Sequence, residues 1–156
     1  MHSFFRYTLS LFFFLLVQAC VWAQPAHYRM EIIGTRDGLL SSKIYALFQA
    51  QNRILWIGTE FGISVYDGYG FSNYQYTAAN ETIGRILCIT EDNEKGIWLG
   101  GDKGLFYLKE GYLQKINLHG NASIAVEALL TDAAGNIWVG DLNALYKITT
   151  KDIRNI

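Results

Sequence analysis

Residues 56–66 read WIGTEFGISVY, and two further stretches of this 156-residue chain repeat the same phrase. Residues 98–108 read WLGGDKGLFYL and residues 138–148 read WVGDLNALYKI, so the tryptophans are 42 and 40 residues apart. Similarity at a fixed period of this size is typical of a repeat architecture. The sequence therefore predicts three copies of one structural unit, which would build a surface for recognition more readily than a catalytic centre.

The repeat extends backwards from each tryptophan in the same register. Twelve residues before it stands a branched aliphatic residue, and two positions later a small one. The pairs are Ile44 and Ala46, Ile86 and Cys88, and Val126 and Ala128. A polar loop follows at residues 92–96 and 132–136, whereas residues 50–53 make a weaker turn. About 23 positions per unit thus align column by column.

Each unit reads as short strands separated by Asn, Asp and Gly, which accept the backbone angles of tight turns. The strands are rich in Ile, Val, Tyr, Phe and Trp, as pleated sheets favour. We expect strands at 43–49, 54–59, 63–66, 71–76, 85–91, 96–100, 105–108, 112–117, 125–131, 136–140, 145–149 and 152–156. Four strands in about 40 residues are typical of one β-propeller blade.

The predicted fold is therefore all-β, an incomplete propeller of about three four-stranded antiparallel blades preceded by a signal peptide. The expected boundaries are 1–23 for the signal peptide, 24–36 for an N-terminal strand, and roughly 37–77, 78–118 and 119–156 for the blades.

Three predictions concern single positions in the blades. The tryptophans are expected to be structural wedges between neighbouring sheets, with a ligand-stacking role as the alternative. Gly62 and Gly104 are expected to supply a positive φ in the turn between the second and third strands. Ala144 replaces that glycine in the third unit, so its turn should be strained or differently shaped.

The N-terminus has the features of a secretory signal peptide. A basic start with Arg6 precedes a short apolar run at residues 9–17, and Val21-Trp22-Ala23 fits the small-x-small cleavage pattern. A membrane anchor and lipid attachment at Cys20 are the alternatives, although the run is shorter than the roughly 20 residues that a spanning helix needs.

Charge and cysteine content narrow the classes of function. Without Arg6, twelve basic and fourteen acidic residues remain. The net charge is therefore slightly negative and does not favour binding to nucleic acid. After cleavage Cys88 is the single cysteine, so an intrachain disulfide is excluded. Because Cys88 occupies the column of Ala46 and Ala128, we expect a buried free thiol; a reactive cysteine is the alternative.

Two segments resemble a known family. Residues 56–68, Trp-Ile-Gly-Thr-x-x-Gly-Ile-x-x-Tyr-Asp-Gly in pattern, resemble the two-component regulator propeller repeat, and residues 37–44 resemble the segment that starts its first blade. The resemblance covers nearly all of residues 28–156. It is to the N-terminal periplasmic sensor region of hybrid two-component sensor histidine kinases, best known from Bacteroidetes.

The resemblance implies a larger parent protein with many blades, a membrane span and a kinase core. It also implies that the strand at 28–33 would close the ring by joining a last blade. A closed propeller needs at least four blades. The chain is therefore expected to be the N-terminal piece of a larger sensor or a truncated gene product, with exposed blade edges that self-association could cover.

The sequence offers no catalytic residues, no cofactor-binding residues and no metal ligands that we would single out. His27 and His119 stand in polar segments without partners of metal-binding type, so solvated loop histidines are expected. In an up-and-down blade, turns between strands two and three share a face with the connections between blades. The weak candidates for ligand binding on this face are Glu60, Phe61, Asp102, Lys103 and Asn143.

The expected function is a periplasmic ligand-sensing propeller fragment of a two-component sensor, without enzymatic activity of its own. The resemblance implies an extracellular small molecule or oligosaccharide as ligand, no nucleic acid partner, and a parent anchored in the inner membrane. One alternative is a structural module that assembles with other chains through its blade edges. The other is the remnant of a propeller lyase or glycosidase, which would need acidic or histidine side chains converging on the channel.

Overall fold

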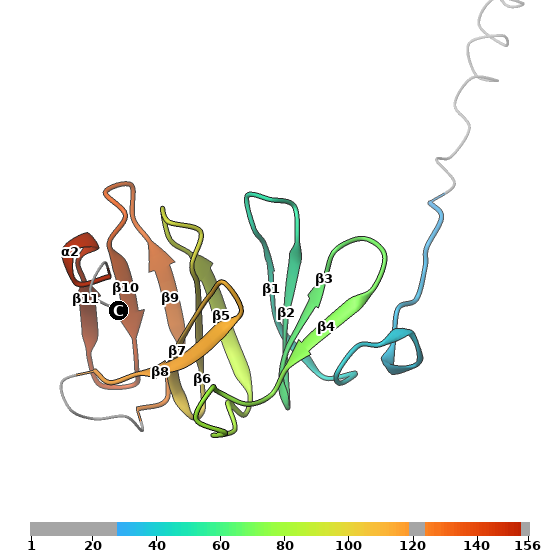
Figure 1. Ribbon diagram of the computed structural model, residues 1–156, viewed down its shortest axis with the longest axis horizontal. Coiled ribbons are helices and arrows are strands. Elements are labelled where there is room, and N and C mark those ends of the chain that lie inside the picture. The colour runs from blue at the N-terminus through green and yellow to red at the C-terminus, as the bar shows by residue number, and fades with distance from the viewer. Residues whose placement is uncertain (1–27, 119–123, 154–156) are drawn as a thin grey trace, which may run out of the picture. The chain divides into compact units, whose positions relative to one another are not determined.

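The computed structural model describes residues 28–118 and 124–153, and within them almost all regular structure is β (Figure 1). Three antiparallel sheets follow one another along the chain. The first is formed by β1 (Ile44–Gln49), β2 (Leu55–Thr59), β3 (Gly62–Tyr66) and β4 (Phe71–Tyr74). The second is formed by β5 (Ile86–Glu91), β6 (Ile97–Gly101), β7 (Gly104–Lys109) and β8 (Tyr112–Ile116). The third is formed by β9 (Ala128–Thr131), β10 (Ile137–Gly140) and β11 (Leu145–Ile148).

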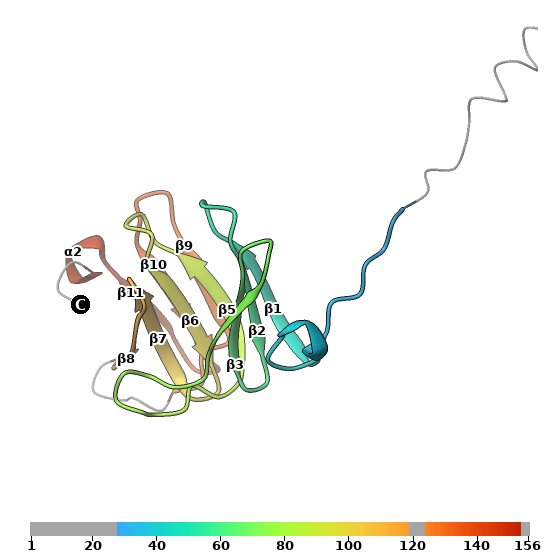
Figure 2. The same cartoon turned by 45° about the vertical axis from the view of Figure 1, so that its right-hand side comes forward.

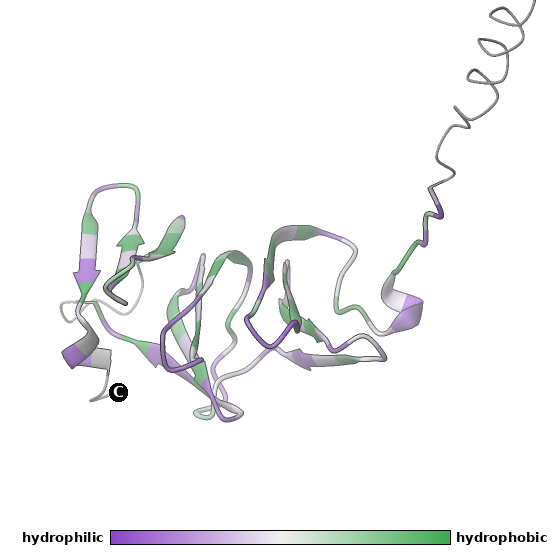
Figure 3. Ribbon diagram, turned by 90° about the horizontal axis from the view of Figure 1, so that it is seen from above, coloured by the Kyte–Doolittle hydropathy of each residue, from purple (hydrophilic) through white to green (hydrophobic). Residues whose placement is uncertain are grey.

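The predicted all-β blade architecture is confirmed, although the third sheet has three strands among the described residues where four were expected: these sheets are blades 1, 2 and 3 of an up-and-down β architecture. Strands pair in chain order within each blade, and innermost strand β1 packs beside β5, as β5 does beside β9. In Figure 3 the strands of each blade carry stretches of apolar colour, as expected for sheets that bury a face. Eleven of the strands expected from the sequence are present, with ends shifted by a few residues.

The twelfth expected strand, at residues 152–156, is wrong over its described part. Residues Thr150–Ile153 form α2, a single helical turn. The Asp152 carboxylate accepts hydrogen bonds from the backbone N–H and the hydroxyl of Thr149, at 3.1 and 2.6 Å. This local capping stabilises a helical turn where a strand would need a longer hairpin. Residues 154–156 lie outside the described part of the chain.

The N-terminal strand expected at 24–36 is also wrong where the structure describes it. Residues 28–34 have no regular structure, and η1 (Thr35–Asp37) is a 3-10 helix. A strand needs a neighbour to pair with, and the described residues hold no last blade for it to join. The expected signal peptide at 1–23 lies outside the described residues. Over the described ranges, no helix is both long enough and apolar enough to cross a bilayer.

Turn chemistry explains the hairpins between second and third strands. In blades 1 and 2 the ladders run to Thr59–Gly62 and Gly101–Gly104, which leaves two-residue turns. Gly62 and Gly104 have φ of 136° and 125°, as predicted. In blade 3 the ladder stops at Gly140–Leu145, and residues 141–144 form a longer loop. The prediction of a differently shaped turn at Ala144 is confirmed.

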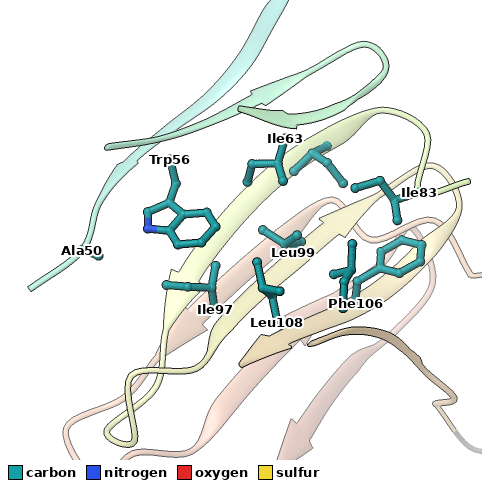
Figure 4. Packing of buried hydrophobic residues seen from close by; sticks show 10 residues of the cluster. Ala50, Trp56, Ile63, Ile83, Ile97, Leu99, Phe106 and Leu108 are labelled. Carbon is teal, nitrogen blue, oxygen red and sulfur yellow. The ribbon is translucent and has the colours of Figure 1, made fainter. Parts of the chain in front are cut away.

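The core lies between successive blades. Trp56 of blade 1 packs with Ile97, Leu99 and Leu108 of blade 2, and Figure 4 shows its indole beside Ile97 and Leu108. At the next interface between blades, Trp98 of blade 2 packs with Ile137 and Val139 of blade 3 and is fully buried. Trp56 and Trp98 therefore each wedge between their own blade and the next, which is the structural role predicted for the tryptophans, whereas Trp138 is half-buried and has no further blade against it among the described residues.

Cys88 lies in a small site between blades 2 and 3 and is half-buried there, where a fully buried thiol was expected. Its Sγ lies 3.8 Å from the carbonyl oxygen of Val126, and the thiol is free. Burial, with the Glu127 carboxylate nearby, raises its pKa to about 12. Gly100 makes room for both neighbours, since a Cβ there would lie 2.5 Å from the Cys88 sulfur and 2.5 Å from Val126 Cγ1.

In two of the blades, an aspartate side chain stabilises the turn before the tryptophan by hydrogen bonds. Oδ1 of Asp92 accepts hydrogen bonds from the backbone N–H groups of Glu94 and Gly96, while Oδ2 accepts from Trp98 Nε1 at 3.0 Å. Asp132 does the same in blade 3, with Trp138 Nε1 at 2.9 Å.

Blade 1 lacks this carboxylate. Ala50 occupies the aspartate column, although its backbone N–H still donates to the carbonyl oxygen of Ile54 at 3.0 Å. Trp56 Nε1 is consequently buried without a hydrogen-bond partner. Where the sequence indicated a weaker turn, at residues 50–53, the structure thus leaves one buried hydrogen-bond donor unsatisfied, the indole N–H of Trp56.

Candidate functional site

The turns that the sequence singled out for ligand binding lie at one end of the three blades, opposite the β1–β2, β5–β6 and β9–β10 turns (Figures 1 and 2). Glu60, in the β2–β3 turn, accepts a hydrogen bond from Lys43 Nζ at 2.8 Å. This bond and the charge of Glu60 raise the pKa of Lys43. The carboxylate is therefore engaged with the residue just before β1 of the same blade.

Asp102 repeats this arrangement in blade 2. It accepts from the backbone N–H of Arg85 at 2.9 Å, and Oδ2 lies 3.9 Å from the Arg85 guanidinium. The guanidinium also lies over the ring of Tyr45, 5.5 Å from its centroid, which connects blades 1 and 2 by a cation–π contact. The basic and acidic partners occupy the same columns in both blades, and this recurrence points to a role in blade structure.

The other candidates share no contact with these pairs that would make one site. Phe61, Lys103 and Asn143 are exposed, each in the turn of a different blade. The backbone N–H of Asn143 donates to Asp141 Oδ1 at 2.6 Å, so this turn is capped internally. The connection at 119–123 lies outside the described residues. The five candidates are thus distributed one or two to a blade and remain predictions.

A concave site lies elsewhere, where the outer strand of blade 1 meets the outer hairpin of blade 2. This pocket has a volume of about 220 Å³. It is lined by Tyr74, Tyr76, Thr77, Ala78, Gly111, Tyr112 and Leu113. Tyr76 and Tyr112 are exposed and Tyr74 is half-buried against the core between the blades. We call this the tyrosine groove.

Backbone hydrogen bonds fix the walls of the tyrosine groove. The N–H of Ala78 donates to the carbonyl oxygen of Leu113 at 2.9 Å, which ties the connection after blade 1 to β8. Glu110 and Gly111 both have positive φ, 52° and 83°, the signature of a two-residue type I′ turn. Because this turn is tight, Tyr112 follows it at a fixed place on the groove rim.

Sequence reasoning missed the three tyrosines. It pointed to the connections between blades, and the connection after blade 1 contributes Thr77 and Ala78 to the groove, but it treated residues 71–76 and 112–117 only as strands. The available signal was the aromatic spacing of Tyr74 and Tyr76 next to that connection. Among the described residues, no group of three or more His, Cys, Asp or Glu side chains is placed to hold a metal ion.

Comparison with protein families identifies the first blade. Residues 38–61 match the family model described as the two component regulator propeller. This segment is a two-component regulator propeller repeat. The matched residues comprise the segment just before β1, the strands β1 and β2, and the start of the turn to β3. In blades 2 and 3 the tryptophan lies at the same position of the second strand as Trp56 does in blade 1. No curated protein matches the chain in sequence.

Two solved structures resemble the chain. One is virginiamycin B lyase from Staphylococcus aureus, at 17% sequence identity and a TM-score of 0.57, with 70% of this chain and 39% of the lyase covered. The other is the extracellular domain of a protein described as a one component system from B. thetaiotaomicron, at 16% identity and a TM-score of 0.38, with 74% and 22% covered. The chain therefore spans well under half the length of either protein, and the first likeness supports the fold alone.

Proposed function

We propose that this chain is an exported, non-catalytic recognition propeller of a two-component signalling system, and that an oligosaccharide binds in its tyrosine groove. The family match to the two-component regulator propeller supports the signalling role. The observation that carries the ligand class is the groove of about 220 Å³ between blades 1 and 2, with three tyrosines on its walls.

The chemistry of the groove suits a sugar. A pyranose ring has an apolar face of C–H groups and a polar rim of hydroxyls, and tyrosine offers a flat apolar ring with a hydroxyl at its tip. Tyr76 and Tyr112 both line the groove and are exposed to solvent, one from the segment after blade 1 and the other from blade 2. Concave sites with aromatic walls and a few polar groups are the usual form of small-molecule sites.

The turn candidates contribute less to this proposal. Glu60 forms an ion pair with Lys43, and Asp102 forms one with Arg85, so a ligand that binds either carboxylate would have to displace an ion pair within the blade. Phe61, Lys103 and Asn143 would serve as a secondary contact surface for a longer polymer that extends over the blade ends. An enzymatic role is no part of the proposal.

A glycan array followed by calorimetry tests the proposal. We expect saturable binding of a defined class of oligosaccharide, weakened about tenfold or more by Tyr112→Ala or Tyr76→Ala, because one lost aromatic contact of about 1.4 kcal/mol is a factor of ten. The matched control is Tyr69→Ala, since Tyr69 is fully exposed in the β3–β4 turn, away from the groove. The bound sugar should be recovered unchanged by mass spectrometry.

Binding that both groove variants leave intact would move the ligand site elsewhere. No binding to any saccharide would exclude the ligand class, and depolymerised sugar would exclude the non-catalytic role. A second candidate function, the interaction module, is favoured by the exposed apolar side chains of blade 3.

A further inference from the structure

The tyrosine groove has no charged side chain on its walls. The seven residues that line it are the three tyrosines, Thr77, Ala78, Gly111 and Leu113. A carboxylate or sulfate that entered the groove would therefore leave water without meeting a cation among these residues. Removal of a charge from water is costly unless an opposite charge replaces the lost hydration. The lining by itself thus favours a ligand without charge.

Two exposed acidic residues stand in the segments that form the groove. Glu110 directly precedes Gly111 in the β7–β8 turn. Glu81 is bound through its backbone to Thr77: its carbonyl oxygen accepts from the Thr77 N–H at 2.8 Å, and its own N–H donates to Thr77 Oγ1 at 3.1 Å. The local backbone therefore holds each acid beside a residue that lines the groove, one on the blade 1 side and one on the blade 2 side.

The two lysines of the β7–β8 hairpin are engaged away from the groove. Lys109 Nζ donates to Glu94 Oε2, in the β5–β6 turn, at 2.8 Å. This hydrogen bond raises the pKa of Lys109. Lys115 Nζ lies over the ring of the buried Phe106, 5.9 Å from its centroid, in a cation–π contact. Neither ammonium group belongs to a residue that lines the groove, so neither offsets the two acids there.

We propose that the tyrosine groove selects neutral oligosaccharides and rejects sugars that carry carboxylates or sulfates. This inference rests on the proposed sugar-binding function and adds the charge class of the ligand. Tyrosine hydroxyls donate and accept hydrogen bonds without charge, which suits the hydroxyls of a neutral sugar. An anionic group on the same sugar would lose hydration and would be repelled by Glu81 and Glu110. Specificity of this kind uses a repulsive element together with an attractive one.

A glycan array that carries neutral, carboxylated and sulfated oligosaccharides tests the selection. We expect every sugar whose binding Tyr112→Ala weakens to be neutral. For the tightest of them that has a primary hydroxyl, oxidation of that hydroxyl to a carboxylate should weaken binding in calorimetry about tenfold or more. The matched ligand is the methyl ester of the oxidised sugar, which is uncharged again and should recover most of the affinity. Binding of the neutral sugar should change little with salt, because it involves no ion pair.

A cation placed in the groove should relax the selection. Ala78 lines the groove and is exposed, whereas Ala79 is exposed next to it and is not a lining residue. Ala78→Arg should therefore raise the affinity for the oxidised sugar, relative to the neutral one, about tenfold, because a guanidinium pairs with a carboxylate by charge-assisted hydrogen bonds. Ala79→Arg is the matched control and should leave that ratio nearly unchanged.

Removal of the two acids tests the repulsive element separately. The double variant Glu81→Gln, Glu110→Gln keeps the shape of both side chains and removes their charge. It should narrow the difference in affinity between the neutral and the oxidised sugar by about threefold, since exposed charges act through water. Glu127→Gln is the matched control, because Glu127 is an exposed acid directly before β9 in blade 3. It should leave the difference unchanged.

Failure of the selection and failure of sugar binding give different results. The selection is overturned by a carboxylated or sulfated sugar that binds as tightly as the neutral ones and loses affinity in Tyr112→Ala. It is also overturned if oxidation leaves the affinity of the tightest neutral sugar unchanged. In both cases the groove still binds sugar, so the proposed function stands. If no saccharide of any charge binds, the proposed function itself fails and the selection fails with it.

Discussion

Replacement of Asp92, whose carboxylate hydrogen-bonds the turn before Trp98 in blade 2, is the sharpest test of how much these hydrogen bonds stabilise the fold. Asp92 is almost fully buried, and its carboxylate accepts from Gly96 N and Trp98 Nε1, which are both buried, and from Glu94 N. A buried donor left without an acceptor costs about 1–3 kcal/mol. Asp92→Ala should therefore lower the free energy of unfolding by about 2–6 kcal/mol for the two buried donors.

Blade 1 shows that the turn itself survives this change. Ala50 stands in the aspartate column, yet its backbone N–H and carbonyl make the same turn hydrogen bonds as those of Asp92. The loss in Asp92→Ala should consequently appear as stability and not as a rearranged sheet. A loss of this size is a large part of the roughly 5–15 kcal/mol that holds a domain.

The measurement is urea denaturation followed by tryptophan fluorescence and by circular dichroism. Asp92→Asn is the matched variant: its amide oxygen still accepts from the turn, but its NH₂ group faces the indole N–H. It should lose less than Asp92→Ala. A cost below about 1 kcal/mol for Asp92→Ala, with an unchanged m-value, would refute the reasoning from buried donors.

Three other predictions follow from the same columns. Ala50→Asn should raise the free energy of unfolding by about 1 kcal/mol in urea denaturation, because its amide oxygen offers Trp56 Nε1 an acceptor; no gain would mean that the indole is satisfied by water. Asn136 and the Trp138 indole hold the pKa of Asp132 down to about 2. Its contribution to stability is complete above the unfolded pKa of about 4 and is lost as the pH falls towards 2, so Asp132→Asn should flatten the acid limb of a pH–stability curve. Cys88, with a pKa raised to about 12, should resist thiol reagents at pH 8 in the native protein and react at once in denaturant; fast native labelling would show that the site opens.

Much of the fold follows from local pattern. The tryptophan period, the small column of Ala46 and Cys88, and the glycines after the second strand predicted blades, strands and turns that the structure has. These features work locally, since a two-residue turn needs positive φ and a strand needs alternating apolar residues. Both errors lie at the ends, at 28–36 and 152–153, where a strand needs a partner that the pattern of one segment does not supply.

The candidate site was harder to predict than the fold. Glu60 and Asp102 were chosen because they occupy turns on one face, but whether a carboxylate is free depends on Lys43 and Arg85, which are 17 residues away in the chain. The tyrosine groove needs β4 of one blade beside the β7–β8 turn of the next, and no spacing within a repeat encodes that adjacency.

The amino-acid sequence by itself determined the repeat, the all-β class and the structural role of the tryptophans, because each rests on residues within one blade and its copy. Only the tertiary structure decided which faces are covered, that Trp56 Nε1 lacks an acceptor, and that Tyr112 and Tyr76 line the same groove. The physical reason is that burial and hydrogen-bond satisfaction depend on what packs against a blade, and the neighbouring blade lies about forty residues away in the chain.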